Sequence, residues 1–512
     1  MKILKTMKKI TKLFLSAILI ISVLAPIKQA SADDIDQKTA RQVGAYFLAS
    51  QFGDKAITPS SLEQVYSIEN SDLDKTAIYV FNTADKRGFV VVSGSECVDP
   101  IIAYSTEGSF DPNNIAPGLQ WWLNDQAEPI IYAQNNAIEA SEESTIAWRT
   151  LIDEKLPYFG SNTKDNEIIR LLTSTWNQEP LYNAMCPVDN TGHLSVIGCV
   201  ATAMAQIMYY WRYPRKGNSS VAYLNSGQYI EADFSAAYYD YDNMVDALTS
   251  SSTQEQIDAV ALLSYHCGVS VKMGYSSESS GAVSADVPKA MYKYFKYVQD
   301  SIKFVERKNT QYYNANSTTA PNEKDTLWVN MLIKQIKMKR PVYYSGHDNN
   351  GGTHSGHAFV CDGWNPNSKT MHFNWGWGGA GDCWCNVYKS NLKPQGGSLS
   401  SYKFSSSHAV ITGITPPLDS IPENLRPVSI NTVDDPFAAA IYPNPASEQI
   451  TVSYTIPAGQ NAELQVFDVT GRCVKQMTVT SNSNQVTVSV ADLRPGVYVC
   501  RLQGYSKKFI VK

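Results

Sequence analysis

One stretch near the middle of the chain, residues 198–211, restricts the possible folds more than any other. It reads Gly-Cys-Val-Ala-Thr-Ala-Met-Ala-Gln-Ile-Met-Tyr-Tyr-Trp, and its large apolar side chains recur at the spacing of one buried helical face. Pro214 ends the pattern, because proline disfavours helical geometry in the residue before it. The stretch therefore predicts a core helix whose first turn carries Cys199, directly after Gly198.

Cys199 has two interpretations. At the start of a helix, a thiol meets unpaired backbone N–H groups and the positive end of the helix dipole, and both favour the thiolate. Gly198 has no side chain, so a substrate carbonyl could approach the sulfur closely. The alternative is a buried cysteine with a purely structural role. Residues elsewhere in the chain decide between the two.

A cysteine nucleophile needs a base, a group that orients the base, and a donor for the oxyanion. A histidine follows a glycine in a strand-like run, an amide stands beside two tryptophans, and a glutamine lies upstream of the cysteine. In chain order, these candidate catalytic residues are Gln178, Cys199, His357, Asn374 and Trp375. This is the order found in papain-like cysteine proteases.

The stretches 198–214, 356–363 and 374–379 resemble the streptopain family of bacterial cysteine peptidases. The resemblance implies a papain-like fold, with Gln178 as the oxyanion glutamine and a tryptophan that takes on much of the orienting of the histidine. It also places candidate substrate-binding residues along the cleft, and these are Gly198, Gly356 and Trp377.

The N-terminal part reads as two segments. Residues 1–32 combine a lysine-rich start, a short apolar run and a small-x-small cleavage pattern, which predicts a signal peptide. Residues 33–150 then carry a helical pattern at 39–52 and a hairpin pattern at 78–94. This segment resembles the inhibitory prosegment of streptopain-type zymogens. We expect the activating cut in the polar stretch 139–166.

Residues 151–415 are the predicted catalytic domain, large enough for one substantial core. Helical patterns occur at 198–211, 252–267, 288–295 and 328–339, and strand patterns occur at 342–345, 357–363, 371–375 and 408–412. Helices followed by antiparallel strands predict an α+β fold with a cleft between the two halves. A turn at 365–368 predicts a hairpin in which His357 lies opposite Trp375 or Gly376.

The C-terminal part begins with a proline-rich linker, residues 416–436. Residues 437–512 alternate like short strands separated by turns, which predicts a small all-β sandwich. This region resembles the C-terminal sorting domain of the type IX secretion system. The resemblance implies passage through the periplasm and the outer-membrane type IX machinery to the medium or the outer cell surface. Without it, an adhesive or carbohydrate-binding sandwich would be the interpretation.

Composition and spacing exclude other classes of site. Zinc could be imagined on His347, His354, His357, His372, Cys383 and Cys385. These spacings match none of the usual zinc patterns well, so we expect no metal and no cofactor. The net charge of −5 gives no basic excess for nucleic acid. Nine cysteines in an exported chain raise the question of disulfides, whose connectivity cannot be read from sequence.

The sequence therefore predicts a secreted cysteine endopeptidase made as a zymogen. The predicted fold class is α+β, a papain-like cysteine protease fold with an N-terminal α+β pro-domain and a C-terminal all-β sandwich. Its expected partners are protein or peptide substrates, its own prosegment and the secretion machinery. Two other functions would use the same chain: a transferase or amidase on a papain-like fold, and an inactive surface adhesin that binds through the cleft and the sandwich.

Overall fold

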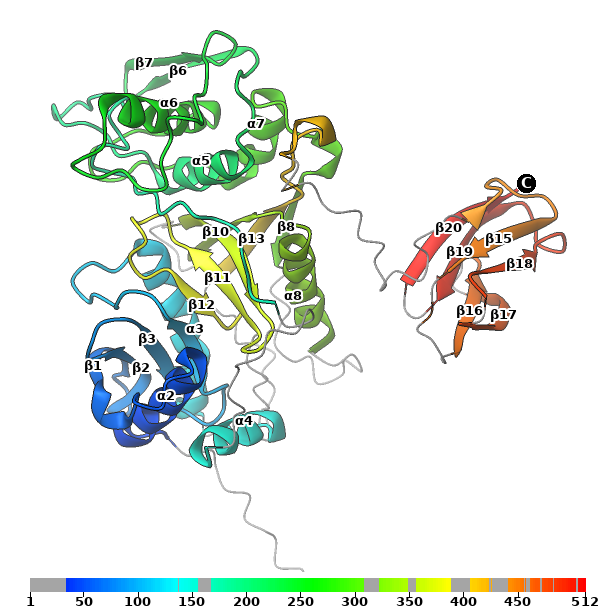
Figure 1. The fold of residues 1–512 in the computed structure, drawn as a ribbon, viewed down its shortest axis with the longest axis horizontal. Coiled ribbons are helices and arrows are strands. Elements are labelled where there is room, and N and C mark those ends of the chain that lie inside the picture. The colour runs from blue at the N-terminus through cyan, green and yellow to red at the C-terminus, as the bar shows by residue number, and fades with distance from the viewer. Residues whose placement is uncertain are drawn as a thin grey trace, which may run out of the picture. The chain divides into compact units, whose positions relative to one another are not determined.

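The computed structural model describes residues 34–136, 138–154, 167–307, 322–348, 356–387, 406–422, 425, 441–454, 456, 461–469, 472–481, 483–502 and 505–512. These residues belong to two compact units, Met1–Leu425 and Arg426–Lys512, which are described separately (Figure 1). The predicted signal peptide, His354 and most of the predicted linker lie outside the described residues. Within the described ranges, no helix is both long enough and apolar enough to cross a membrane.

One large antiparallel sheet joins the N-terminal strands of the first unit to its later strands. Its strands follow the order β1-β2-β3-β4-β12-β11-β10-β9-β13-β8, and β5 pairs with β10 beside this path. The N-terminal strands are β1 (Leu62–Asn70), β2 (Lys75–Thr83), β3 (Phe89–Ser93) and β4 (Ile101–Ser105). The later strands are β5 (Ile169–Arg170), β8 (Lys303–Arg307), β9 (Val342–Asp348), β10 (Gly356–Asn365), β11 (Thr370–Asn374), β12 (Cys383–Cys385) and β13 (Ser406–Thr412).

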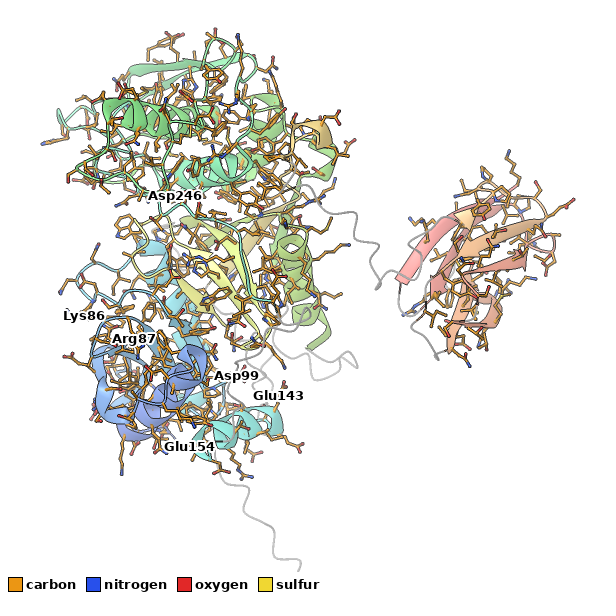
Figure 2. The ribbon with its side chains drawn as sticks, in the orientation of Figure 1. Lys86, Arg87, Asp99, Glu143, Glu154 and Asp246 are labelled. Atoms are coloured by element: carbon orange, nitrogen blue, oxygen red, sulfur yellow. The ribbon has the colours of Figure 1, made fainter. Side chains whose placement is uncertain are left out.

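The N-terminal segment joins this sheet through β4, which pairs with β12 and places Tyr104 opposite Trp384. Beside this pair, the amide of Asn386 donates to the carboxylate of Asp99 at 2.9 Å; Figure 2 labels Asp99. The N-terminal strands therefore extend the sheet of the later half. The boundary predicted near residue 150 remains a prediction, because no break in the sheet marks it.

Helices cover both faces of the sheet. On one face, α5 (Cys199–Trp211), α6 (Gln254–Ser270) and α7 (Val287–Lys293) share a hydrophobic core with β9, β10 and β13. On the other face, α3 (Pro117–Asn135) and α8 (Asn322–Lys337) share a second core with the same strands. A third core joins α2 (Gln37–Phe52) and α4 (Glu142–Ile152) to the N-terminal strands. The hairpin of β6 (Ser220–Asn225) and β7 (Gln228–Asp233) contacts α6 (Figure 1). The predicted α+β class is confirmed.

Helix α5 begins at Cys199, as the sequence predicted. Its N-cap, Gly198, has φ 87°, and a Cβ atom there would lie 2.8 Å from both the Met273 side chain and the carbonyl oxygen of Ser280. Only glycine meets both demands without strain. The pattern predicted one buried face, whereas α5 is buried on nearly all sides because α6 and β10 pack around it. The polar Gln206 in its middle is buried as well.

The predicted register of the β10–β11 hairpin is wrong. His357 was expected opposite Trp375 or Gly376, but β11 ends at Asn374, and Asn374 lies opposite Val360. His357 instead pairs with a residue of β9. A register shift between positions 361 and 363 displaces the two strands, and the turn closes one residue later than predicted. Neither feature has a signature in the strand pattern.

The second unit is a small all-β sandwich, as predicted. One sheet holds β14 (Ile441–Tyr442), β15 (Gln449–Ser453) and β18 (Gln485–Ser489). The other holds β17 (Cys473–Thr480), β16 (Asn461–Phe467), β19 (Gly496–Leu502) and β20 (Tyr505–Val511). Apolar side chains from both sheets form one core, among them Ile450, Val488, Leu464 and Phe509. The short β14 and the final strand, β20, were not predicted.

Candidate active site

A pocket of about 1050 Å³ lies at the start of α5. It gathers side chains from distant parts of the chain, and five of the eight predicted site residues line it: Gln178, Cys199, Gly356, His357 and Trp377. The other three are not among its described lining residues, and these are Gly198, Asn374 and Trp375. The structure therefore brings together the proposed nucleophile, base and oxyanion donor.

The thiol of Cys199 faces the strand half of the pocket. It accepts a hydrogen bond from the backbone N–H of Ala358, the residue after His357. Burial raises the pKa of the Cys199 thiol above its ordinary value, and the hydrogen bond from Ala358 opposes this only in part. Burial therefore opposes the effect expected from the helix N-terminus, and the thiolate form of Cys199 stays a prediction.

Gln178 lines the same pocket as Cys199, and its backbone is hydrogen-bonded to the segment just before Cys199. Its carbonyl oxygen accepts a hydrogen bond of 3.3 Å from the N–H of Ile197, two residues before Cys199. Its own N–H donates to the side chain of Asn177 at 2.8 Å. The residue predicted to donate to the oxyanion, Gln178, therefore lines the same pocket as Cys199.

Trp375 lies on the same face of the sheet as His357. Side chains alternate along β10, which puts His357 on the face of Phe359. The ring centroids of Phe359 and Trp375 are 4.7 Å apart. The indole N–H of Trp375 donates to the carbonyl oxygen of Gly381 at 2.8 Å, which fixes the ring within its own glycine-rich loop. Trp375 is therefore placed behind the histidine strand, outside the pocket lining.

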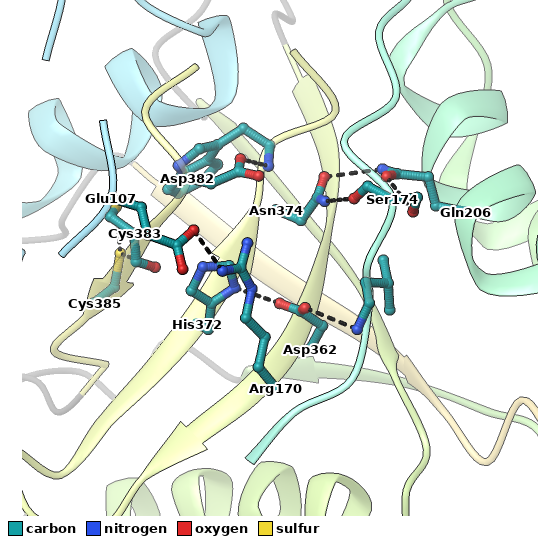
Figure 3. Close-up of polar contacts among 12 residues, drawn as sticks. Glu107, Arg170, Ser174, Gln206, Asp362, His372, Asn374, Asp382, Cys383 and Cys385 are labelled. Carbon is teal, nitrogen blue, oxygen red and sulfur yellow. Dashed lines mark hydrogen bonds and ion pairs between the residues drawn. The ribbon is translucent and has the colours of Figure 1, made fainter. Parts of the chain in front are cut away.

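The side chain of Asn374 is hydrogen-bonded to three neighbouring groups. Its Nδ2 donates to the carbonyl oxygen of Ser174 at 2.7 Å, and its Oδ1 accepts from Gln206 Nε2 at 2.9 Å and from the N–H of Gly376 at 3.0 Å (Figure 3). It lies opposite Val360, whose side chain belongs to the core shared with α5. This pairing puts Asn374 on the α5 face of the sheet, and its expected role in orienting His357 stays a prediction.

Two further predicted residues lie where the sequence placed them, at the border of the pocket. Gly356 is exposed at the start of β10, and a Cβ atom there would meet only ordinary contacts. Trp377 reaches the pocket from the glycine-rich loop, and its ring N–H donates to the side chain of Asn114 at 3.0 Å. Asn114 belongs to the N-terminal segment, so that segment contacts a predicted substrate-binding residue directly.

The N-terminal segment makes other contacts around the site. Pro117 lines the pocket itself. The ring of Trp121 covers Gly346, where a Cβ atom would lie only 2.0 Å from it, and Gly346 is the residue that pairs with His357. Asp125 lies 3.1 Å from the imidazole of His408 on β13, and both side chains are buried. Prosegment-like residues therefore occupy one side of the strand half of the cleft.

A buried polar cluster lies beneath the glycine-rich loop (Figure 3). His372 Nδ1 is 2.6 Å from Asp362 Oδ1, and both side chains are buried. Figure 3 also draws the pair of Arg170 with Glu107 at 2.8 Å, in which the Glu107 side chain is exposed. Asp382 accepts the backbone N–H of Trp375 at 2.9 Å, and burial raises the pKa of its carboxyl group to about 6. His372 is thus a partner of a carboxylate. Among the described residues, no group of histidine, cysteine and acidic side chains could hold a metal ion.

The cysteines are all unpaired. Seven of them, apart from Cys199 and Cys473, are buried, and Cys383 and Cys385 have their sulfur atoms 3.4 Å apart on β12. Burial raises the pKa of the thiol well above its ordinary value at Cys361 and Cys385. Cys199 is therefore the one cysteine that lines the pocket within the described part of the chain.

Sequence reasoning missed the polar residues that support the site. Gln206, Ser174 and Asp382 are all buried, and each holds a segment that carries a predicted site residue. One signal was present, since a glutamine inside an otherwise apolar helix pattern needs a hydrogen-bond partner when the helix is buried.

Three protein-family models match the chain. The peptidase C10 family matches residues 176–385, the Spi protease inhibitor matches residues 32–130, and the secretion system C-terminal sorting domain matches residues 440–512. The first match contains all eight predicted site residues. The other two fall on the segments that resemble a prosegment and a sorting domain.

Two individual cysteine proteases are also similar to this chain. Streptopain of Streptococcus pyogenes is 29% identical over 358 residues, which are 67% of this chain and 82% of streptopain. The thiol protease/hemagglutinin PrtT of Porphyromonas gingivalis is 26% identical over 400 residues, which are 76% of this chain. The chain spans only 43% of that relative's length.

Solved structures of interpain A from Prevotella intermedia are also similar. A prointerpain A fragment is 27% identical, with a TM-score of 0.52, and the match covers 70% of this chain and 99% of the fragment. Active interpain A is 31% identical, with a TM-score of 0.40, and the match covers 50% of this chain and 98% of that protein. The likeness to the prointerpain fragment confirms the predicted papain-like fold.

Proposed function

We propose that the pocket hydrolyses peptide bonds, with Cys199 as nucleophile and His357 as acid and base, because residues 176–385 match the peptidase C10 family and both streptopain and prointerpain A are similar to this chain. The observation that carries the proposal is the pocket itself, which gathers Gln178, Cys199 and His357. These are the three groups that acyl transfer to a cysteine requires. The expected substrates are proteins and peptides.

The reaction follows from these three groups. Cys199 passes its proton to His357, and the sulfur attacks the carbonyl carbon of the peptide bond. The N–H of Cys199 and the side-chain amide of Gln178 donate to the oxyanion that forms. His357 then protonates the leaving amine, the C–N bond breaks, and the acyl group remains on the sulfur. Water attacks this thioester with His357 as base, which releases the acid and restores the thiol.

The N-terminal segment is proposed to hold the precursor inactive. It matches an inhibitor family, and Pro117 and Asn114 touch the pocket and its Trp377. In this state, burial keeps the pKa of Cys199 above its ordinary value, so the thiol is the favoured form at neutral pH. Cleavage between the N-terminal segment and the catalytic part would release the cleft.

The nucleophile can be identified by labelling. The processed protein, treated with a peptidyl epoxide, should carry one label at Cys199 and lose peptidase activity in step with it. Cys473 is exposed in the C-terminal unit and serves as an internal control for non-specific alkylation. Peptide mapping by mass spectrometry measures both sites. Equal rates of labelling at Cys199 and Cys473, with peptidase activity retained, would instead favour the alternative function of an inactive surface adhesin.

We also propose that the C-terminal unit is a sorting signal that the type IX secretion machinery of the outer membrane recognises. It matches the sorting family, and the described residues of its core all belong to this unit. Deleting residues 430–512 should leave the peptidase activity of the isolated enzyme near that of the full chain. In the native host, the same deletion should retain the protein in the periplasm, as measured by fractionation and immunoblotting.

The matched control for this deletion is a fusion. Residues 430–512 attached to an unrelated exported protein should carry that cargo to the surface or the medium in a host with the secretion system. Two results would overturn the proposal: a truncated protein that still reaches the medium, or a truncated enzyme that is folded but inactive. The latter would mean that the sandwich supports the cleft.

A further inference from the structure

We propose that Gln206 is a positioning residue that sets the oxyanion site. It does so by fixing residues 174–178, here called the oxyanion segment, against the helix that carries Cys199. This inference rests on the roles proposed above for Cys199 and Gln178. Gln206 lies seven residues after Cys199 on α5, about two helical turns, so both side chains leave the same side of the helix.

The side chain of Gln206 is fully buried and bound on both ends. Its Oε1 accepts from the hydroxyl of Ser174 at 2.8 Å and from the backbone N–H of Trp176 at 3.2 Å. Its Nε2 donates to Oδ1 of Asn374 at 2.9 Å. Figure 3 shows the side chains of Gln206 and Asn374 meeting at Ser174, between α5 and the end of β11. A buried amide with three partners has one well-defined orientation.

The oxyanion segment depends on such contacts because it has no regular secondary structure. Its backbone groups must find partners elsewhere. The N–H of Thr175 donates to the carbonyl oxygen of Asp246 at 2.8 Å, and Figure 2 labels Asp246. The carbonyl oxygen of Trp176 accepts from the N–H of Gly378 at 3.2 Å. Gln206 supplies the partner for the N–H of Trp176, two residues before Gln178.

Asn374 completes the arrangement from the strand half. It donates to the carbonyl oxygen of Ser174, while Gln206 accepts from the hydroxyl of the same serine. Ser174 is therefore bound by both Asn374 and Gln206. Because Gln206 also binds Asn374, it links both of these residues to α5, the helix that carries Cys199. Loss of the Gln206 amide would free two contacts to the oxyanion segment and one to Asn374. This gives Asn374 a task that its sequence position did not reveal.

The expected effect is on the chemical step. Oxyanion donors act by being in place before charge develops, and small displacements of such groups cost large factors in rate. Gln206→Met keeps the length of the side chain and removes both hydrogen-bonding ends. It should lower kcat about 10- to 100-fold and change KM little. Ser174→Ala removes only one of the contacts and should give a smaller loss in the same direction.

The decisive experiment compares two inhibitors on processed enzyme. The full-length variants are converted by tagged wild-type enzyme, which is then removed. A peptide aldehyde forms a tetrahedral adduct whose oxygen occupies the oxyanion site, whereas iodoacetamide needs only the sulfur. Gln206→Met should weaken the aldehyde about 10- to 100-fold and leave the rate of Cys199 alkylation within about twofold. Gln178→Ala should show the same pattern. The double variant should be little worse than either single one.

The control for general loosening of α5 is Ile207→Ala, at a fully buried neighbour whose side chain has no hydrogen-bonding group. It should lower the melting temperature and weaken neither inhibitor selectively. If Gln178→Ala weakens the aldehyde but Gln206→Met and Ser174→Ala do not, this inference is overturned and the proposed function stands. If Gln178→Ala itself has no effect on the aldehyde, the proposed role of Gln178 as oxyanion donor is overturned. The inference about Gln206 is then overturned as well. If Gln206→Met does not fold, Ser174→Ala carries the test.

Discussion

Full-length protein with Cys199 replaced by alanine is expected to remain uncleaved, while the wild-type chain converts itself to a shorter form. The reason is that the only pocket-lining thiol among the described residues is lost, and with it the nucleophile proposed for the cut. Helix α4 covers residues 142–152, and hydrogen-bonded helices resist proteolysis. We therefore expect the new N-terminus within residues 153–170. Gel electrophoresis and N-terminal sequencing over a time course measure both outcomes.

The control is the same variant mixed with a trace of active wild-type enzyme, which should cleave it at the same bond. This distinguishes a lost nucleophile from a misfolded cleavage site. Conversion of Cys199→Ala at the wild-type rate, with no other protease present, would contradict self-activation.

His357→Ala should lower kcat about 10³-fold, within the range expected for loss of a general acid–base group. Without the imidazole, the group proposed to protonate the leaving amine is missing. The thermal stability of the protein should change little, because His357 is only partly buried at the start of β10. Steady-state kinetics on a peptide substrate and a melting curve measure the two effects.

His347→Ala is the matched control. His347 lines the same pocket and is exposed, and it lies on β9 opposite Gly356. It should cost less than about tenfold, since its imidazole takes no part in the proposed proton transfers. Equal losses at both positions, or zinc in the purified protein, would favour the metal site that the histidine-rich sequence first raised.

Much of the fold could be read from local patterns. Helix α5 and its start at Cys199 follow from a glycine, an apolar stripe and a proline, all of which act within a few residues. The strands of the sandwich follow from alternation and turn residues in the same way. The pairing of β4 with β12 could not be read, because it joins segments nearly three hundred residues apart through two short strands whose patterns specify no partner.

The site was predictable where chemistry selects the residue type. Gln178, Cys199 and His357 were found by the groups that acyl transfer needs, and they line one pocket. The position of Asn374 was not predictable, because a single shifted register moves a side chain to the other face of the sheet. Gln206 was missed because its partners come from two distant segments, and hydrogen bonds of that kind leave no periodic pattern.

The central claim is that Cys199 and His357 act as one ion pair once the N-terminal segment has been removed. The measurement that tests it is the rate of Cys199 alkylation by iodoacetamide as a function of pH. An adjacent imidazolium stabilises the thiolate and lowers the thiol pKa, so processed wild-type enzyme should react fast well below pH 8, with its inflection at acidic to neutral pH. In the precursor, where burial raises the pKa of Cys199, alkylation should be slow at neutral pH. In processed His357→Ala, the inflection should move up to about pH 8.5, the ordinary value for a thiol. Identical profiles in processed wild-type enzyme and His357→Ala, both rising only above pH 8, would contradict the account.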